Sequence, residues 1–158
     1  MKASIDHLQK RLEVEGLKIT NFFLGLNDSD WNRVIYNTDS EWTLLHVLKH
    51  FVSVEQAFQW LIQDVLEGGT GAPKDFEIDE FNEAEVGRFI EYQPVEMIQT
   101  FQKLRRDSIS LAGTLSADDL EKRGNHPYFG NTTIKKILKL LYTHNSLHMR
   151  DVRRALRG

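Results

Sequence analysis

A chain of 158 residues without cysteine can form neither disulfide bonds nor thiolate metal sites, so any bound metal must use His, Asp, Glu or water. The net charge of -3 gives no electrostatic reason to expect a nucleic acid or an anionic membrane as the partner. Hydrophobic residues (41%) and charged residues (27%) stand in the proportions of a globular protein, and we expect one domain over residues 1–158.

The N-terminal sequence gives no indication of export. The stretch "MKASIDHLQKRLEVEG" lacks the apolar segment of a signal peptide. No apolar run in the chain approaches the roughly 20 residues that cross a bilayer. We therefore expect a cytoplasmic protein that makes no use of a membrane.

Four segments carry apolar residues at helical spacing, and the predicted helices are residues 4–26, 41–67, 94–115 and 132–156. The turn formers of "NDSDW" end the first helix. Asp39 or Ser40 can cap the second, which ends at "GGTGAP". Pro94 suits the first position of the third helix, and "SADDL" after it predicts a short helical turn. Asn131 or Thr132 can cap the fourth helix.

The second and third helices are separated by a long segment, "GGTGAPKDFEIDEFNEAEVGRFIEYQ", with a short helix expected around residues 80–92. Its acidic part is expected to be a solvated linker, or alternatively to cover a pocket or a dimer surface with Phe76, Ile78 and Phe81. No strand is predicted, because "RVIY" is too short to build a sheet. We therefore predict an all-α four-helix bundle with a long crossover connection between helices two and three. The aromatic content is compatible with a homodimer.

Two histidines of the last helix, His144 and His148, stand four residues apart. Side chains at this spacing project from the same helical face, so both imidazoles can reach one metal ion. The alternative is a pair of histidines satisfied by hydrogen bonds or solvent, and the spacing alone does not decide. "HNSLH" also has Asn145 where a zinc-protease helix carries its catalytic Glu.

The second helix carries another pair four residues apart, His46 and His50. Three histidines from two facing helices would leave one coordination position open, as catalytic metals require. Glu55 falls inside the apolar stripe of this helix, and we favour a buried carboxylate paired with an Arg or an indole N–H. The alternative for Glu55 is a hydrogen bond that fixes a histidine tautomer. His126, in "GNHPYFG", is interpreted as a turn or packing residue, with a pocket contact as the alternative.

Three stretches together resemble the DinB-like (DinB/YfiT-type) superfamily of bacterial metal-binding four-helix bundles. They are "EWTLLHVLKHFVSVE", "HPYFGNTTIKKILKLLYTH", and the H-x-x-x-H of the last helix with its basic "MRDVRRAL" tail. In the first stretch, Trp42, Thr43, His50 and Glu55 match the family pattern. The resemblance spans nearly the whole chain, and the order and spacing of the motifs carry it.

The resemblance implies a metal triad with one histidine from helix two and two from the last helix, namely His50, His144 and His148. Two residues depart from the family pattern. His46 stands where relatives carry Glu or another polar residue, so it could compete as a ligand or be exposed. Asp151 stands near a position where many relatives carry Gln.

The resemblance also bears on chemistry. Some family members look like metal-dependent transferases or isomerases that use thiols such as bacillithiol or mycothiol. We therefore expect a divalent metal, zinc or nickel first and iron or manganese as alternatives. The expected activity is that of a metal-dependent thiol S-transferase or hydrolase acting on a low-molecular-weight thiol or another small substrate. The alternative is a stress-response protein that binds a metal or ligand without turnover.

Overall fold

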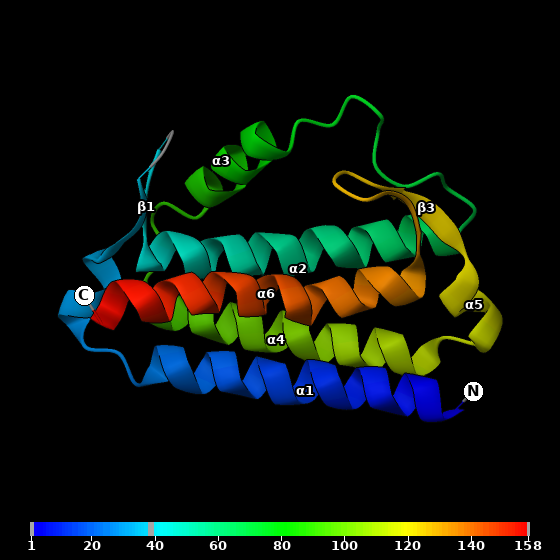
Figure 1. The fold of residues 1–158 in the computed structure, drawn as a ribbon, viewed down its shortest axis with the longest axis horizontal. Coiled ribbons are helices and arrows are strands. Elements are labelled where there is room, and N and C mark those ends of the chain that lie inside the picture. The colour runs from blue at the N-terminus through cyan, green and yellow to red at the C-terminus, as the bar shows by residue number, and fades with distance from the viewer. Residues whose placement is uncertain (1, 38–39, 158) are drawn as a thin grey trace.

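Four long helices form a bundle in the computed structural model, which describes residues 2–37 and 40–157 (Figure 1). The bundle helices are α1 (Lys2–Leu24), α2 (Leu44–Leu66), α4 (Pro94–Thr114) and α6 (Ile134–Arg157). Each overlaps most of a helix that the apolar spacing predicts, so the all-α four-helix bundle is confirmed. Within the described ranges, none of the helices has both the length and the apolar character needed to cross a membrane.

The bundle has a crossed topology rather than simple up-and-down winding. α1 and α6 run in one direction, and α2 and α4 run in the opposite direction (Figure 1). α1 packs against α4 and α6, and α2 packs against the same two helices. Because α2 and α4 are parallel, the chain between them must return along the outside of the bundle, which confirms the predicted crossover. This connection carries α3 (Ile78–Arg88) over α2, close to the predicted short helix, and α5 (Ala117–Glu121) follows α4 as expected.

Two short antiparallel hairpins occur along the chain, one between α1 and α2 and one between α4 and α6. The prediction that no strand forms was wrong. The strands are β1 (Val34–Asn37) with β2 (Glu41–Thr43), and β3 (Arg123–His126) with β4 (Gly130–Thr133). A short 3-10 helix, η1 (Asp28–Asn32), precedes β1. Each strand has only three or four residues, too few for an alternating pattern to distinguish it from a loop.

The start of α2 differs from the prediction, because β2 occupies the residues assigned to its first turn. Thr43 is the N-cap, and its backbone N–H donates to Nδ1 of His46 at 2.9 Å. Ser40, a predicted cap, instead donates its hydroxyl to Glu83 of α3. Asp39, the other predicted cap, lies outside the described residues.

The start of α6 also lies later than predicted. Asn131 and Thr132, the predicted caps, belong to β4. The hydroxyl oxygen of Thr133 accepts the backbone N–H of Lys136 at 3.2 Å instead, which satisfies one free donor of the first turn.

The glycine-rich turn after α2 is fixed to β3. Gly71 has a φ of 86° and forms an isolated bridge with Asn125, whose backbone would collide with any Cβ at Gly71. The N–H of Asn125 donates to the carbonyl of Thr70 at 2.7 Å, and the N–H of Ala72 donates to the carbonyl of Asn125 at 2.8 Å. These bonds hold the first part of the α2–α3 connection beside the β3–β4 hairpin.

A buried ion pair joins all four bundle helices. Arg105 of α4 donates from Nε and Nη2 to the two carboxylate oxygens of Glu55 of α2, both at 2.9 Å. The same guanidinium donates to the backbone carbonyls of Leu12 in α1 and Leu141 in α6, at 3.1 and 3.3 Å. The hydroxyl of Ser108 donates to Glu55 at 2.7 Å. Glu55 is therefore a buried carboxylate paired with an Arg, as we favoured, and its bonds do not reach a histidine.

Candidate metal centre

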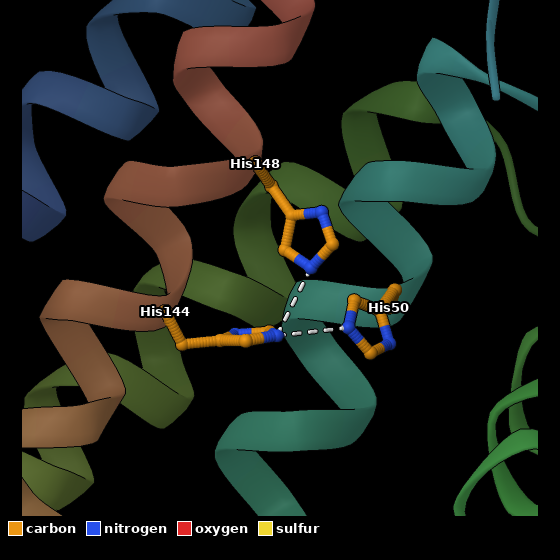
Figure 2. A group of neighbouring side chains, drawn as sticks. All are labelled: His50, His144 and His148. Carbon is orange, nitrogen blue, oxygen red and sulfur yellow. Dashed lines mark hydrogen bonds between the residues drawn. The ribbon is translucent and has the colours of Figure 1, made fainter.

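Three histidines from two adjacent antiparallel helices point their rings at one another (Figure 2). His50 comes from α2, and His144 and His148 come from successive turns of α6. Nε2 of His144 lies 3.2 Å from Nε2 of His50 and 3.0 Å from Nε2 of His148. One ligand atom of each residue lies within 4.8 Å of the others, so this group could hold a metal ion. The structure thus brings together the three histidines that the sequence singles out.

The spacing of the three nitrogens suits a single metal ion. Two imidazole nitrogens bound to one tetrahedral ion, at bonds of about 2.0–2.1 Å, lie roughly 3.3 Å apart. The distances of 3.2 and 3.0 Å around His144 are close to that value. A set of three imidazoles suits zinc, nickel and ferrous iron, and leaves a further position for water or substrate.

Burial keeps the three imidazoles neutral near pH 7. It is the main reason that the pKa of His50 lies well below its ordinary value, with His144 and His148 adding to the effect. Burial and then His144 lower the pKa of His148 to about 4, against the opposing effect of Asp151. For His144, burial lowers the pKa more than the hydrogen bond with Asn145 raises it. A neutral imidazole has a free lone pair, which is the form that binds a metal.

A tyrosine and a carboxylate fix the ring of His148. The hydroxyl oxygen of Tyr36, in β1, lies 2.7 Å from Nδ1 of His148, and the same hydroxyl donates to Asp151 at 3.1 Å. Because its single proton goes to Asp151, the tyrosine oxygen accepts the Nδ1–H of His148, which directs the Nε2 lone pair to the centre. Burial and the charge of Asp151 raise the pKa of Tyr36, so the phenol stays protonated. Sequence reasoning missed Tyr36, and it left Asp151 without a role.

The other two histidines have different surroundings. Nδ1 of His144 lies 3.3 Å from the side-chain oxygen of Asn145. Nδ1 of His50 is buried and has no hydrogen-bond partner among the described residues. The indole of Trp42, in β2, packs against His50 with ring centroids 5.2 Å apart and donates to Glu83 of α3 at 2.8 Å. Trp42 therefore contacts both a histidine of the cluster and a side chain of α3.

The three histidines border a cavity of about 690 Å³, a size typical of sites for small molecules. α2 and α6 form its floor, while α3, the α2–α3 connection and the β3–β4 turn form its roof. The lining is mainly apolar. Phe76, Ile78 and Phe81 line the roof, so the segment interpreted first as a solvated linker covers a pocket, as its alternative interpretation held.

Two other histidines have separate positions. The ring of His46 is bound to its own helix start by the hydrogen bond from Thr43, and it is not part of the cluster. His126 accepts hydrogen bonds within the β3–β4 turn and also lines the cavity, so both interpretations of this residue hold.

The fold and the site together define a four-helix bundle with a three-histidine cluster that could hold a metal ion and opens on an apolar cavity. The chain belongs to the DinB superfamily, whose sequence profile matches residues 12–152. This match confirms the resemblance carried by the three sequence motifs. No curated protein matches the sequence significantly.

Several solved structures share the fold. YfiT from Bacillus subtilis, described as a probable metal-dependent hydrolase with an unusual four-helix bundle topology, has a TM-score of 0.80 and 19% identity, covering 99% of this chain and 88% of that one. The sibling lethal factor precursor DfsB has a TM-score of 0.76 and 14% identity, with coverages of 97% and 95%. The colibactin self-resistance protein ClbS, solved with dsDNA, has a TM-score of 0.74 and 9% identity, with coverages of 97% and 94%. At these identities the likeness shows the fold alone.

Proposed function

We propose that this protein is a metal-dependent enzyme that binds one divalent ion through His50, His144 and His148. Its substrate is a small molecule held in the adjoining cavity, and the reaction is transfer to a low-molecular-weight thiol or hydrolysis. The observation that carries the proposal is the convergence of three neutral imidazole nitrogens at the floor of a mainly apolar cavity of about 690 Å³. Zinc or nickel is the proposed ion, with iron or manganese as alternatives.

The residues around the site have separate tasks in this proposal. A divalent ion held there supplies Lewis acidity and lowers the pKa of a water or thiol that reaches it. The three imidazoles provide the lone pairs, and Tyr36 with Asp151 keeps His148 in the required tautomer. The apolar lining displaces water from the substrate and strengthens the electrostatic interactions at the floor.

Two observations support the reaction classes. YfiT, which has the same fold, is described as a probable metal-dependent hydrolase, and this favours hydrolysis. The family resemblance favours thiol transfer. In both reactions, an ion held by the three histidines would supply an activated water or thiol, and the cavity would hold the electrophile beside it.

An activity screen with the metal-loaded protein tests the proposal. Thiol transfer is measured with 1-chloro-2,4-dinitrobenzene and bacillithiol, mycothiol, glutathione or coenzyme A, where sulfur bonds to the ring and chloride leaves. Hydrolysis is measured with 4-nitrophenyl esters. We expect turnover that requires the metal and disappears in His144→Ala. Tight metal binding without turnover in any assay would contradict the enzyme and favour the alternative, a stress-response protein that binds its ligand without reaction.

Replacing Tyr36 by Phe should weaken metal binding while the bundle stays folded. The change removes one hydroxyl, which leaves the Nδ1–H of His148 without its acceptor. Loss of such a partner typically lowers metal affinity by about 10- to 100-fold. Zinc affinity, measured by competition with a chromogenic chelator, checks this result. Tyr92→Phe, at an exposed tyrosine, is the matched control and should keep full affinity. Equal zinc affinities of the two variants would show that Tyr36 does not support metal binding.

The charges of the cavity favour a small molecule over a nucleic acid. ClbS, with the same fold, was solved with dsDNA, so the fold itself does not exclude nucleic acid. In this chain, however, the carboxylate and guanidinium groups that line the cavity among the described residues are those of Glu85 and Arg88, and they pair with each other at 2.8 Å. A lining without free positive charge does not suit a phosphate backbone.

The proposal includes a homodimer and a cytoplasmic location, which both stay predictions. The rim of the cavity supports the homodimer, because Trp60, Tyr128 and Phe129 line the cavity and are also exposed. Exposed aromatic side chains of this kind are enriched where proteins associate.

A further inference from the structure

His126 is held in one tautomer by the turn that it closes. Its Nδ1 accepts the backbone N–H of Tyr128 at 3.1 Å and that of Phe129 at 3.4 Å. A ring nitrogen that accepts hydrogen bonds carries no proton, so the proton of the neutral ring is on Nε2. Burial is the main reason that the pKa of His126 is lowered to about 4, with smaller electrostatic effects of His144 and Lys136, and the ring is therefore neutral near pH 7.

The N–H at Nε2 is a buried donor without a partner among the residues that the structure describes. Nε2 of His126 is fully buried, and the residue as a whole is 7% exposed. Nearly all buried polar groups in proteins are paired, so an unpaired one calls for an explanation. Because Nδ1 faces the turn, Nε2 points away from it, and an acceptor reaches Nε2 when a neighbouring side chain of the cavity wall moves aside.

The surroundings of this donor are apolar walls of the cavity. The ring of His126 lies edge-to-face on Phe58 of α2, with centroids 5.1 Å apart, and 5.4 Å from Phe129. All three residues line the cavity that the histidine cluster borders. Phe58 lies eight residues after His50 on α2, which corresponds to about 12 Å of helix. His126 therefore packs on α2 about two turns beyond His50, beside the same cavity.

We propose that His126 is a ligand-binding residue whose Nε2–H donates a hydrogen bond to the substrate. The substrate class that fits is a neutral, mainly apolar molecule with an acceptor oxygen, such as a carbonyl, that reaches His126 while its other end approaches the histidine cluster. Among the described residues of the lining, Arg88 and Glu85 pair with each other, which leaves no free carboxylate or guanidinium there to attract an ionic ligand. This inference deepens the proposed function by naming its substrate class, but the donor and the cavity do not depend on a bound metal.

Two probes that differ in one group test the donor. Benzophenone and diphenylmethane have the same two rings, joined by a carbonyl in the first and by a methylene in the second. Their affinities are measured by displacement of Nile red, in both metal-free and zinc-loaded protein. His126→Asn keeps an acceptor for the two backbone N–H groups of the turn but removes the donor at the Nε2 position. His126→Gln places an amide donor near the Nε2 position.

The expected readout is the affinity ratio of the two probes. The preference for benzophenone over diphenylmethane should fall by about 3- to 10-fold in His126→Asn, as expected for loss of one hydrogen bond. His126→Gln should recover part of it, and diphenylmethane affinity should change little. An unchanged ratio in His126→Asn would overturn the inference.

A second measurement uses the wild-type protein and needs no variant to fold. The imidazole proton on Nε2 of His126 should move downfield in NMR spectra when benzophenone is added, and diphenylmethane should leave it in place. The same response to both probes would also overturn the inference. Because the affinity measurements include metal-free protein and the NMR titration can be run on it, the outcome is independent of whether a metal binds and of whether the metal-loaded protein has activity.

Discussion

His144→Ala should abolish divalent metal binding. Nε2 of His144 lies 3.2 Å from that of His50 and 3.0 Å from that of His148, so its loss leaves two donors where an open catalytic site needs three. The wild-type protein, purified without a histidine tag and reconstituted with zinc or nickel, should retain about one equivalent after dialysis. The variant should retain none above background. Elemental analysis by mass spectrometry measures both.

His46→Ala is the matched control for this experiment. His46 is a histidine on the same helix, one turn before His50, but its Nδ1 accepts the N–H of the Thr43 cap. We expect nearly full metal content, with a loss of about 1 kcal/mol in the free energy of unfolding, because the N–H of the cap residue loses its acceptor. A loss of metal as large as that of His50→Ala would contradict the assigned triad. A wild-type protein without metal after reconstitution would contradict the metal centre itself.

Glu55→Ala should reduce the free energy of unfolding by about 3–5 kcal/mol, because it leaves the guanidinium of Arg105 buried without its carboxylate. Both side chains are almost completely buried, with Glu55 1% and Arg105 4% exposed. Solvent therefore cannot replace the lost pair. The effect is large against a typical total stability of about 5–15 kcal/mol. Urea unfolding followed by circular dichroism gives the value.

Two controls make this result specific to burial. Lys103→Ala removes an exposed ion-pair partner of Asp107 on α4, the helix that also carries Arg105. It should lower the free energy of unfolding by no more than about 1 kcal/mol. The double change Glu55→Leu with Arg105→Met removes both buried charges and should recover a large part of the loss. If Glu55→Ala were as mild as Lys103→Ala, the ion pair would not be a main support of the bundle.

The bundle and its crossover follow from the sequence, but the short hairpins in its connections do not. Apolar residues at helical spacing extend over more than five turns in each long helix, and few other structures accept such a pattern. The three-residue strand β2 has no comparable signal, because Glu41, Trp42 and Thr43 fit a strand or a first helical turn equally well. Its strand form depends on pairing with β1, which is a tertiary contact.

The candidate site was predictable to a different degree at each residue. The spacing of His144 and His148 pairs them on one helical face. The preference for His50 over His46 came from the family resemblance, and the structure adds a physical reason, since His46 turns back to the start of α2. Tyr36 had no local signal. It reaches His148 from a strand more than a hundred residues earlier in the chain, and no spacing rule covers such a contact.

The cavity is formed by two parts of the chain that differ in how firmly they are packed. Its floor belongs to α2 and α6, which are locked into the bundle, while its roof consists of interhelical connections. Connections tolerate insertion and exchange far better than packed helices do. A lineage can therefore replace the roof and acquire a new substrate while it inherits the three imidazoles unchanged. Grafting α3 and its flanking segments between relatives would be a practical route to altered selectivity.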